Sequence, residues 1–255
     1  MCGPYAKHAV PWWWAMRYTL PQYFSPSKPH IDRAKKFFNR AEYTLGSPRR
    51  VFFPESQREE GPKALPEIVV MGQPNVGKSS IVRSMVHEDV KVIVATYKGT
   101  TKLAHFYKIG FRFFLVDIPG YEEDDKVMGN TIMREVLQRR PMVKSVLFLV
   151  DCRGGLTDLE QYRIQHLEQY HVPYTFVVTK CDRASEWQLT RTVRQINKIV
   201  DSPWHVRCHR EVFLTSAKEQ IGIDELMVYM CARAGAMSVK KTEIEKEQSL
   251  TIPID

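Results

Sequence analysis

The chain has 255 residues, of which 44% are hydrophobic and 26% charged, so it is long and apolar enough for one large domain with extensions, and wholesale disorder is excluded. Its 37 Lys and Arg against 29 Asp and Glu give a net charge of +8, which favours a polyanionic partner. Five scattered cysteines without CxxC spacing exclude a disulfide framework, and no apolar run approaches the roughly 18 residues of a membrane span.

Residues 1–64 are predicted to form a basic N-terminal extension. Up to Pro54 this segment holds nine Lys or Arg and two Asp or Glu. Its first 24 residues lack acidic side chains and contain three consecutive tryptophans, Trp12 to Trp14, so two interpretations stay open: a mitochondrial transit peptide, or a retained arm that docks on a partner. In either case we expect it to lie outside the core. Apolar residues at three- and four-residue spacing predict an amphipathic helix over 30–45, followed by a linker to Pro66.

Residues 65–234 have the pattern of an α/β domain. Short β-branched runs alternate with helical stretches, which predicts βαβ units and a mostly parallel six-stranded sheet with helices on both faces. Gly110 separates the one expected antiparallel hairpin, 103–109 and 113–116. The other predicted strands are 68–71, 145–150, 175–178 and 212–214, and the predicted helices are 78–86, 130–139, 158–170, 188–200 and 223–234. Residues 235–255 read as a flexible tail.

The segment GQPNVGKS satisfies the pattern GxxxxGK[ST] between a predicted strand and a predicted helix, the context of a phosphate-binding loop. Its backbone N–H groups would point at phosphate oxygens, aided by the positive end of the following helix. Lys78 is expected to reach the β- and γ-phosphates, and the Ser79 hydroxyl to bind Mg²⁺. The other residues expected to touch nucleotide here are Gly72, Pro74, Asn75, Val76, Gly77 and Ser80.

Two further motifs predict contacts with the metal and the γ-phosphate. In DIPG, the carboxylate of Asp117 would emerge at the carboxyl end of a strand and hold the metal through water, while the Gly120 N–H meets the γ-phosphate. In YKGTTKL, a threonine would close over Mg²⁺ and the γ-phosphate when GTP is present; we expect Thr101, with Thr100 as the alternative.

The motif TKCD, Thr179 to Asp182, predicts which base is bound. A carboxylate at Asp182 can accept hydrogen bonds from the ring N–H and the amine of guanine, whereas adenine would leave it unpaired. Lys180 would lay its methylene stem across the base. The tripeptide SAK, Ser216, Ala217 and Lys218, could offer the Ala217 N–H to the guanine oxygen. The expected ligand is therefore GTP or GDP with Mg²⁺.

The segments PEIVVMGQPNVGKSS, KGTTKL, DIPGY, DCRGGLTDLE, TKCD and SAK, in this order, resemble the EngB (YihA/YsxC) family of GTPases over residues 65–234. The resemblance implies a Ras-like domain that hydrolyses GTP with Mg²⁺ and acts in assembly of the large ribosomal subunit. The implied partners are a precursor of that subunit, with its rRNA and proteins, and other assembly factors. Gln73-Pro74 departs from the GRSNVGKSS of bacterial members. The long basic extension resembles organellar relatives, so we expect a monomer without membrane attachment in the mitochondrial matrix, with the cytoplasm as the alternative.

Tyr121 stands where many Ras-like proteins carry the glutamine that orients the attacking water, and a phenol is poorly suited to that role. We therefore expect slow intrinsic hydrolysis, with help from the bound particle or from a K⁺ ion held partly by Asn75. The catalytic set is then Lys78, Thr101 and Gly120, and the metal ligands are Ser79, Thr101 and Asp117. The alternative is a catalytically weak or inactive placeholder that docks on a ribosomal precursor.

Overall fold

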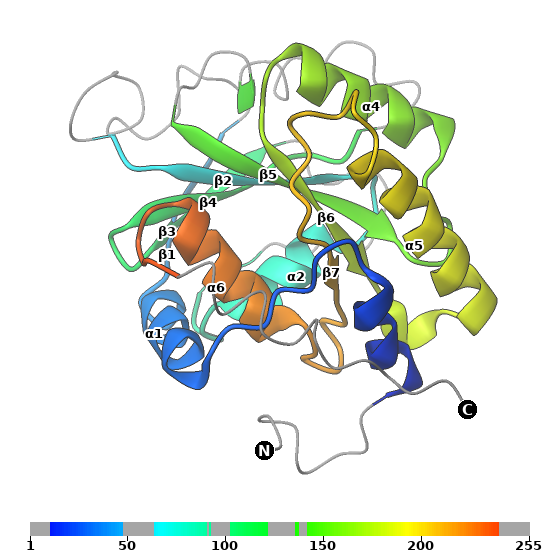
Figure 1. Ribbon diagram of the computed structural model, residues 1–255. Helices are drawn as coiled ribbons and strands as arrows, with labels where there is room; N and C mark the ends of the chain where they lie inside the picture. Colours follow the sequence, from blue (N-terminus) through cyan, green and yellow to red (C-terminus); the bar gives the residue numbers. More distant parts are fainter. Residues whose placement is uncertain are drawn as a thin grey trace.

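A computed structural model of the chain describes residues 11–47, 64–90, 92, 103–121, 136–137 and 142–239. Within these residues a seven-stranded sheet runs in the order β1-β3-β4-β2-β5-β6-β7 (Figure 1). Strand β2 pairs in parallel with β4 and β5, and β6 continues the parallel array to β7. The strands are β1 (Glu42–Ser47), β2 (Glu67–Gly72), β3 (Ala104–Ile109), β4 (Phe113–Asp117), β5 (Val143–Asp151), β6 (Tyr174–Thr179) and β7 (Phe213–Leu214).

Helices cover both faces of the sheet, which confirms the predicted α/β architecture. One apolar cluster joins alternate residues of β2 and β5 to α4, α5 and the 3₁₀ helix η1, and a second joins the intervening residues to α1, α2 and α6. This division follows from the alternation of side chains along each strand. The helices are η1 (Trp12–Thr19), α1 (Lys28–Phe38), α2 (Lys78–Met85), α4 (Asp158–Gln169), η4 (Cys181–Arg183), α5 (Glu186–Val200) and α6 (Ile223–Arg233).

The expected sheet of six strands is corrected to seven, because part of the predicted 30–45 helix is a strand. Helix α1 ends at Phe38, and β1 pairs antiparallel with β3 at the edge of the sheet. The ring of Tyr43 packs on Tyr107 with 5.5 Å between centroids. The open edge of β3 offers β1 ladder hydrogen bonds that a longer helix would forgo, so tertiary pairing overrides the helical spacing. The hairpin of β3 and β4 is confirmed, but it is not the sole antiparallel pairing.

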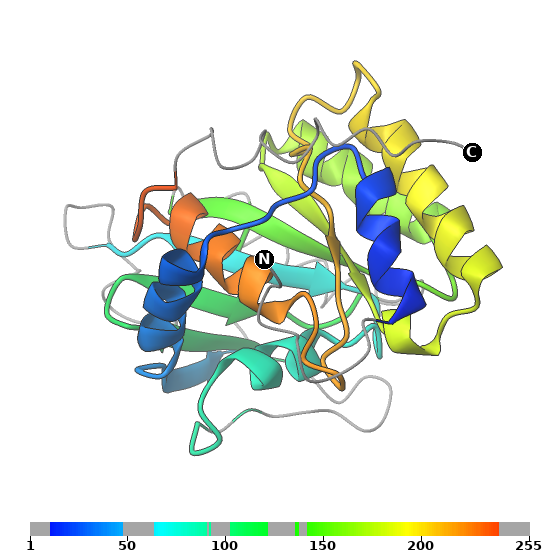
Figure 2. The same cartoon turned by 60° about the horizontal axis from the view of Figure 1, so that its bottom comes forward.

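The described part of the N-terminal extension packs against the domain, contrary to the expectation that it lies outside the core. Trp13 and Trp14 are 2% and 5% exposed and belong to the cluster on the α5 side of the sheet. Figure 2 shows η1 beside α5, and α1 beside α6. An ion pair of 2.7 Å joins Lys35 of α1 to Asp224 of α6. Burial of large aromatic rings makes this packing favourable by several kcal/mol in all.

The remaining predicted segments fall partly outside the described residues. Of the predicted helix 130–139, the structure describes 136–137, both helical, and of the tail it describes 235–239, where Met237 is 5% exposed. The predicted boundaries of the extension, the domain and the tail stay predictions. Among the described residues, no helix has the length and apolarity needed to cross a bilayer.

Candidate active site

The phosphate-binding loop connects the end of β2 to the start of α2 and requires glycine at two positions, one because of its backbone conformation and one because of close packing. Gly77, directly before α2, has a φ of 112°, which disfavours other residues. A Cβ at Gly72 would lie 2.9 Å from the Leu149 carbonyl oxygen of the neighbouring strand. The loop therefore turns tightly at the carboxyl edge of the sheet and directs the amino end of α2 into this region.

Lys78 begins α2 and returns over the loop. Its Nζ donates hydrogen bonds to the carbonyl oxygens of Gly72 at 3.0 Å and Gln73 at 2.9 Å. Burial lowers the pKa of this ammonium to about 8, although the charge of Asp117 acts in the opposite direction. A buried cation held by neutral carbonyls favours a nearby anion, and a phosphate would supply one.

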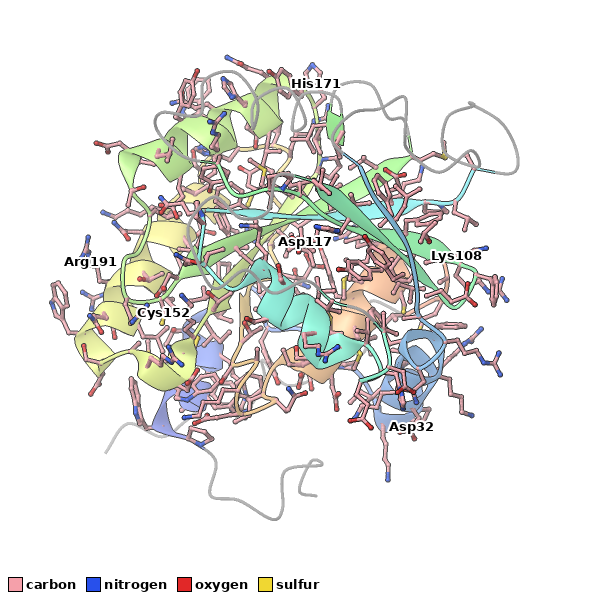
Figure 3. All side chains as sticks on the ribbon, turned by 180° about the vertical axis from the view of Figure 1, so that it is seen from behind. Asp32, Lys108, Asp117, Cys152, His171 and Arg191 are labelled. Atoms are coloured by element: carbon pink, nitrogen blue, oxygen red, sulfur yellow. The ribbon has the colours of Figure 1, made fainter. Side chains whose placement is uncertain are left out.

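Asp117, the last residue of β4, meets the first turn of α2. Its Oδ2 accepts a hydrogen bond of 2.8 Å from the Ser79 hydroxyl, and Figure 3 shows Asp117 beside this end of α2. The carboxylate is fully buried, and its Oδ1 has no hydrogen-bond partner among the described residues. Burial raises the pKa of Asp117 to about 6, opposed by the charge of Lys78 and the Ser79 hydrogen bond. A buried carboxylate oxygen without a partner beside a hydroxyl matches the oxygen ligands that Mg²⁺ prefers.

Gly120 lies directly against the phosphate-binding loop. A Cβ at this position would stand 2.7 Å from the Pro74 nitrogen and 3.0 Å from the Lys78 Nζ, so a larger residue would push the two segments apart. The DIPG turn and the loop are thus in contact. Their contact leaves the Gly120 backbone near the ammonium of Lys78.

The side chain of Tyr121 is buried in the core. Its ring is 3% exposed, stacks on Phe148 at an interplanar angle of 29°, and lies 5.2 Å from the guanidinium of Arg163. Burial raises its pKa well above that of a free phenol. A neutral ring fixed in the core cannot orient a water molecule at the γ-phosphate, which agrees with the interpretation of Tyr121 as a missing catalytic element.

The TKCD motif is attached to the phosphate-binding loop by two side chains. The Thr179 hydroxyl donates to the Val76 carbonyl oxygen at 2.7 Å. Lys180 has a left-handed backbone with φ of 58°, and its Nζ donates to the Asn75 carbonyl oxygen and to Asp151 Oδ2, the latter at 2.9 Å. The segments expected to bind base and phosphates are therefore held in a fixed relation to each other.

Asp182 and Ser216 bring the TKCD and SAK motifs together. The Ser216 hydroxyl donates to Asp182 Oδ1 at 2.7 Å and accepts from the Glu219 backbone N–H at 3.0 Å. The Cys181 N–H donates to the Thr215 carbonyl oxygen at 3.2 Å, so the two loops also join through their backbones. The Asp182 side chain is 6% exposed, and the hydroxyl fixes the rotation of its carboxylate. Ala217 follows half-buried, and Lys218 is exposed.

Asp151 and Arg153 also belong to this site, although the sequence marked them as family features and not as site residues. Arg153 donates to Asp151 Oδ1 through Nε at 3.1 Å and to Oδ2 through a terminal nitrogen at 2.9 Å. Burial alone would raise the pKa of Asp151, but hydrogen bonds from Arg153 and Lys180 outweigh it and lower the pKa to about 2. The pair lines a cavity of about 530 Å³ beside Asn75. The spacing Asp-x-Arg directly after a strand was the available signal.

The structure gathers most of the predicted site residues at one edge of the sheet. Lys78, Ser79, Asp117 and Gly120 meet around the loop, and the TKCD and SAK motifs flank it. Thr100 and Thr101 lie outside the described residues. The individual contacts to nucleotide and metal stay predictions.

Comparison with known proteins agrees with this arrangement. Residues 67–180 match the family model described as "50S ribosome-binding GTPase". The chain is 30% identical to the probable GTP-binding protein EngB of Aquifex aeolicus over 172 residues, covering 65% of this chain and 90% of that protein. It is also 30% identical to the EngB protein of Clostridium perfringens strain 13 over 196 residues, covering 74% and 93%.

A solved structure of similar fold is that of NFeoB from S. thermophilus bound to GDP.AlF4⁻ and K⁺. It superposes with a TM-score of 0.50 at 22% identity and covers 69% of this chain and 65% of that one. At this identity the likeness shows the fold. Together with the intact phosphate-binding and base-binding motifs, the comparisons show a P-loop GTPase, and the chain belongs to the EngB family of GTP-binding proteins.

Proposed function

We propose that this GTPase acts in assembly of the large ribosomal subunit, in the mitochondrial matrix. The GTP-binding part of the proposal rests on the joint geometry of the phosphate-binding loop and the guanine motif, which are linked by the hydrogen bond from Lys180 to the Asn75 carbonyl oxygen. The name of the matching family model supports a ribosomal partner. The basic extension, with its resemblance to organellar relatives, supports the mitochondrial location.

In the proposed complex, GTP lies along the loop with its guanine at Asp182. The ammonium of Lys78 would donate hydrogen bonds to the phosphates in place of the two loop carbonyl oxygens that it contacts in this structure. Backbone N–H groups of the loop and of Gly120 would bind the phosphate oxygens. Because Ser216 already occupies Asp182 Oδ1, the other carboxylate oxygen can accept from the guanine ring N–H and amine with little reorganisation.

Mg²⁺ fits the site formed by Ser79 and Asp117, with Thr101 as the expected third protein ligand. When bound, the ion would neutralise charge on the β- and γ-phosphate oxygens. The chain's own contribution is the buried carboxylate of Asp117, whose Oδ1 has no hydrogen-bond partner among the described residues. The Ser79 hydroxyl would exchange its hydrogen bond with Asp117 for coordination.

Hydrolysis requires a group that positions water, and the Tyr121 side chain is buried in the core. The proposal assigns that role to the ribosomal particle or to a K⁺ ion near Asn75, so turnover by the isolated protein is slow. The alternative is a placeholder that binds GTP without turnover. Single-turnover hydrolysis measured with Na⁺ or K⁺, and with or without large-subunit precursors, separates the two: stimulation supports the enzyme, and none supports the placeholder.

The ribosomal partner and the compartment need a separate test. Tagged protein is sedimented with mitochondrial ribosomal precursors in the presence of a non-hydrolysable GTP analogue or GDP. We expect comigration with the large-subunit precursor that is stronger with the analogue, because GTP would order the loop carrying Thr101. Equal distribution across all fractions in both nucleotide states contradicts the proposed function, and exclusion of the protein from purified mitochondria contradicts the location.

A further inference from the structure

We propose that the outer face of α5 is the surface with which this protein binds RNA. The face consists of Trp187, Arg191, Arg194 and Lys198, here called the α5 stripe. Their spacing of four, three and four residues places them on one side of the helix. The inference rests on the proposed ribosomal function. It adds that α5 makes the contact and that the contacted partner is RNA.

The opposite side of α5 fixes the direction in which the stripe points. Leu189, Val193 and Ile196 are at most 2% exposed and belong to the core cluster beneath the helix. All members of the stripe are exposed, and Trp187 is exposed by 68%, an unusual state for a large indole. Figure 3 shows Arg191 projecting away from the body of the molecule. The helix thus presents a basic face with one aromatic ring to solvent.

Among the residues that the structure describes, no carboxylate pairs with the basic members of the stripe. Arg191, Arg194 and Lys198 form no ion pair with any residue that the structure describes. Glu186, in the first turn, is the single acidic residue of α5. Some other basic residues of the described chain do have carboxylate partners, among them Lys35 with Asp224, Arg210 with Asp201 and Arg233 with Glu211. Uncompensated positive charge on a rigid helix favours a polyanion.

The aromatic part of the surface favours nucleic acid with an unpaired base. The guanidinium of Arg191 lies 5.5 Å from the Trp187 ring centroid, which restrains the ring as a platform. Beside α5, η1 contributes Trp12 and Tyr18, exposed by 50% and 59%, and Asn197 of α5 donates to the Thr19 carbonyl oxygen at 3.0 Å. Exposed rings stack on unpaired bases while Arg and Lys contact phosphates, the usual division of labour in RNA recognition.

The dimensions of the stripe also suit a nucleic-acid backbone. From Trp187 to Lys198 the helix rises by about 16 Å, enough to pass several consecutive phosphates of one strand. An anionic membrane is the less suitable partner, because an interfacial helix turns an apolar face to the lipid and the apolar face of α5 is buried in the core. The structure therefore assigns the stripe to an RNA hairpin, with phosphates along the basic residues and a loop base on Trp187.

The test uses the full-length protein and a labelled RNA hairpin with an unpaired loop, with binding followed by fluorescence anisotropy over a range of salt. In Arg191→Gln/Arg194→Gln, we expect affinity to fall about tenfold or more and the slope of log Kd against log salt to decrease by about 2, one for each lost phosphate contact. The control Arg112→Gln/Lys144→Gln removes the same charge from exposed positions outside α5, in the turn between β3 and β4 and in β5. We expect the control to bind within about twofold of the unmodified protein.

Trp187 provides a second, independent readout. Trp187→Ala is expected to weaken binding about tenfold without changing the salt slope, and Trp187→Phe to recover most of the loss, because stacking does not release counterions. GTP affinity should stay unchanged in all variants, which shows that they fold. Equal RNA binding by the stripe variant and the control overturns the inference.

The same variants distinguish failure of this inference from failure of the proposed function. If the unmodified protein sediments with large-subunit precursors and the stripe variant does so equally, the ribosomal function stands and the α5 assignment is wrong. If the unmodified protein binds neither precursors nor the hairpin, both fail. If it binds phosphatidylserine vesicles more tightly than the hairpin, and the stripe variant loses that binding, the partner is a membrane and the RNA assignment is wrong.

Discussion

Replacement of Asp182 by asparagine is expected to change which base the protein binds. In the proposed complex the carboxylate accepts two hydrogen bonds from guanine, from the ring N–H and the amine. Hydrogen bonds to a charged group contribute about 1.5–3 kcal/mol each. Loss of both predicts a decrease in GTP affinity of roughly 3–6 kcal/mol, or about two to four orders of magnitude in Kd.

The contact with Ser216 makes this expectation specific. The Ser216 hydroxyl is 2.7 Å from Oδ1 and needs an acceptor there, because its own oxygen already accepts from the Glu219 N–H. In Asp182→Asn the side-chain carbonyl would therefore face Ser216 and the NH₂ group would face the base. Against guanine, two donors then meet; against xanthine, the NH₂ group meets the carbonyl at position 2 and can donate to it.

The assay is equilibrium binding of fluorescent GDP and XDP to both proteins in Mg²⁺ buffer. We expect the unmodified protein to prefer GDP and Asp182→Asn to prefer XDP. Ser216→Ala is the matched control, because it removes the orienting hydroxyl and leaves the carboxylate; its GDP affinity should fall about tenfold without a change in preference. Unchanged GDP affinity in Asp182→Asn would refute the assignment of this carboxylate to the base.

Three further predictions concern the core. Burial raises the pKa of Glu225 to about 7; the charge of Asp224 adds to the shift, and Arg17 and Lys35 oppose it. The Glu225 carboxyl therefore loses its proton at lower pH in the unfolded chain than in the folded protein, and the free energy of unfolding falls as pH rises from about 4.5 to 7. Glu225→Gln should therefore raise the free energy of unfolding above pH 7 by about 2–3 kcal/mol and leave it nearly unchanged at pH 4, measured in urea. Trp13→Ala should cost about 3–5 kcal/mol because the ring is 2% exposed, whereas Trp12→Ala, at 50% exposure, should cost less than about 1 kcal/mol; equal losses would show that the segment does not pack as described. Tyr121→Gln should lower stability by about 3 kcal/mol without faster single-turnover hydrolysis, because position 121 faces the core; a tenfold faster rate would contradict that reasoning.

The candidate site was largely predictable because its motifs are local. Glycines that allow a tight turn, a lysine and a hydroxyl at fixed spacing all lie within GQPNVGKS, and their geometry follows from one strand, one turn and one helix. The carboxyl ends of parallel strands meet at one edge of a sheet, so Asp117 and Asp182 could be placed near that loop from the strand pattern. Tyr121 could also be recognised from the sequence, because it stands where many Ras-like proteins carry the glutamine that orients water, and this already indicated a missing catalytic group.

Pairings between distant segments were decided by the tertiary structure. The sequence by itself determined the order of strands and helices in the GTPase domain and the chemistry at their ends, since both follow from local periodicity and turn residues. Only the folded chain shows that β1 completes the sheet edge, that Trp13 and Trp14 lie in the core, and that Lys180 joins Asn75 to Asp151. These contacts depend on groups that the assembled domain leaves without a partner: the open edge of a strand, an uncovered apolar face and a buried carboxylate.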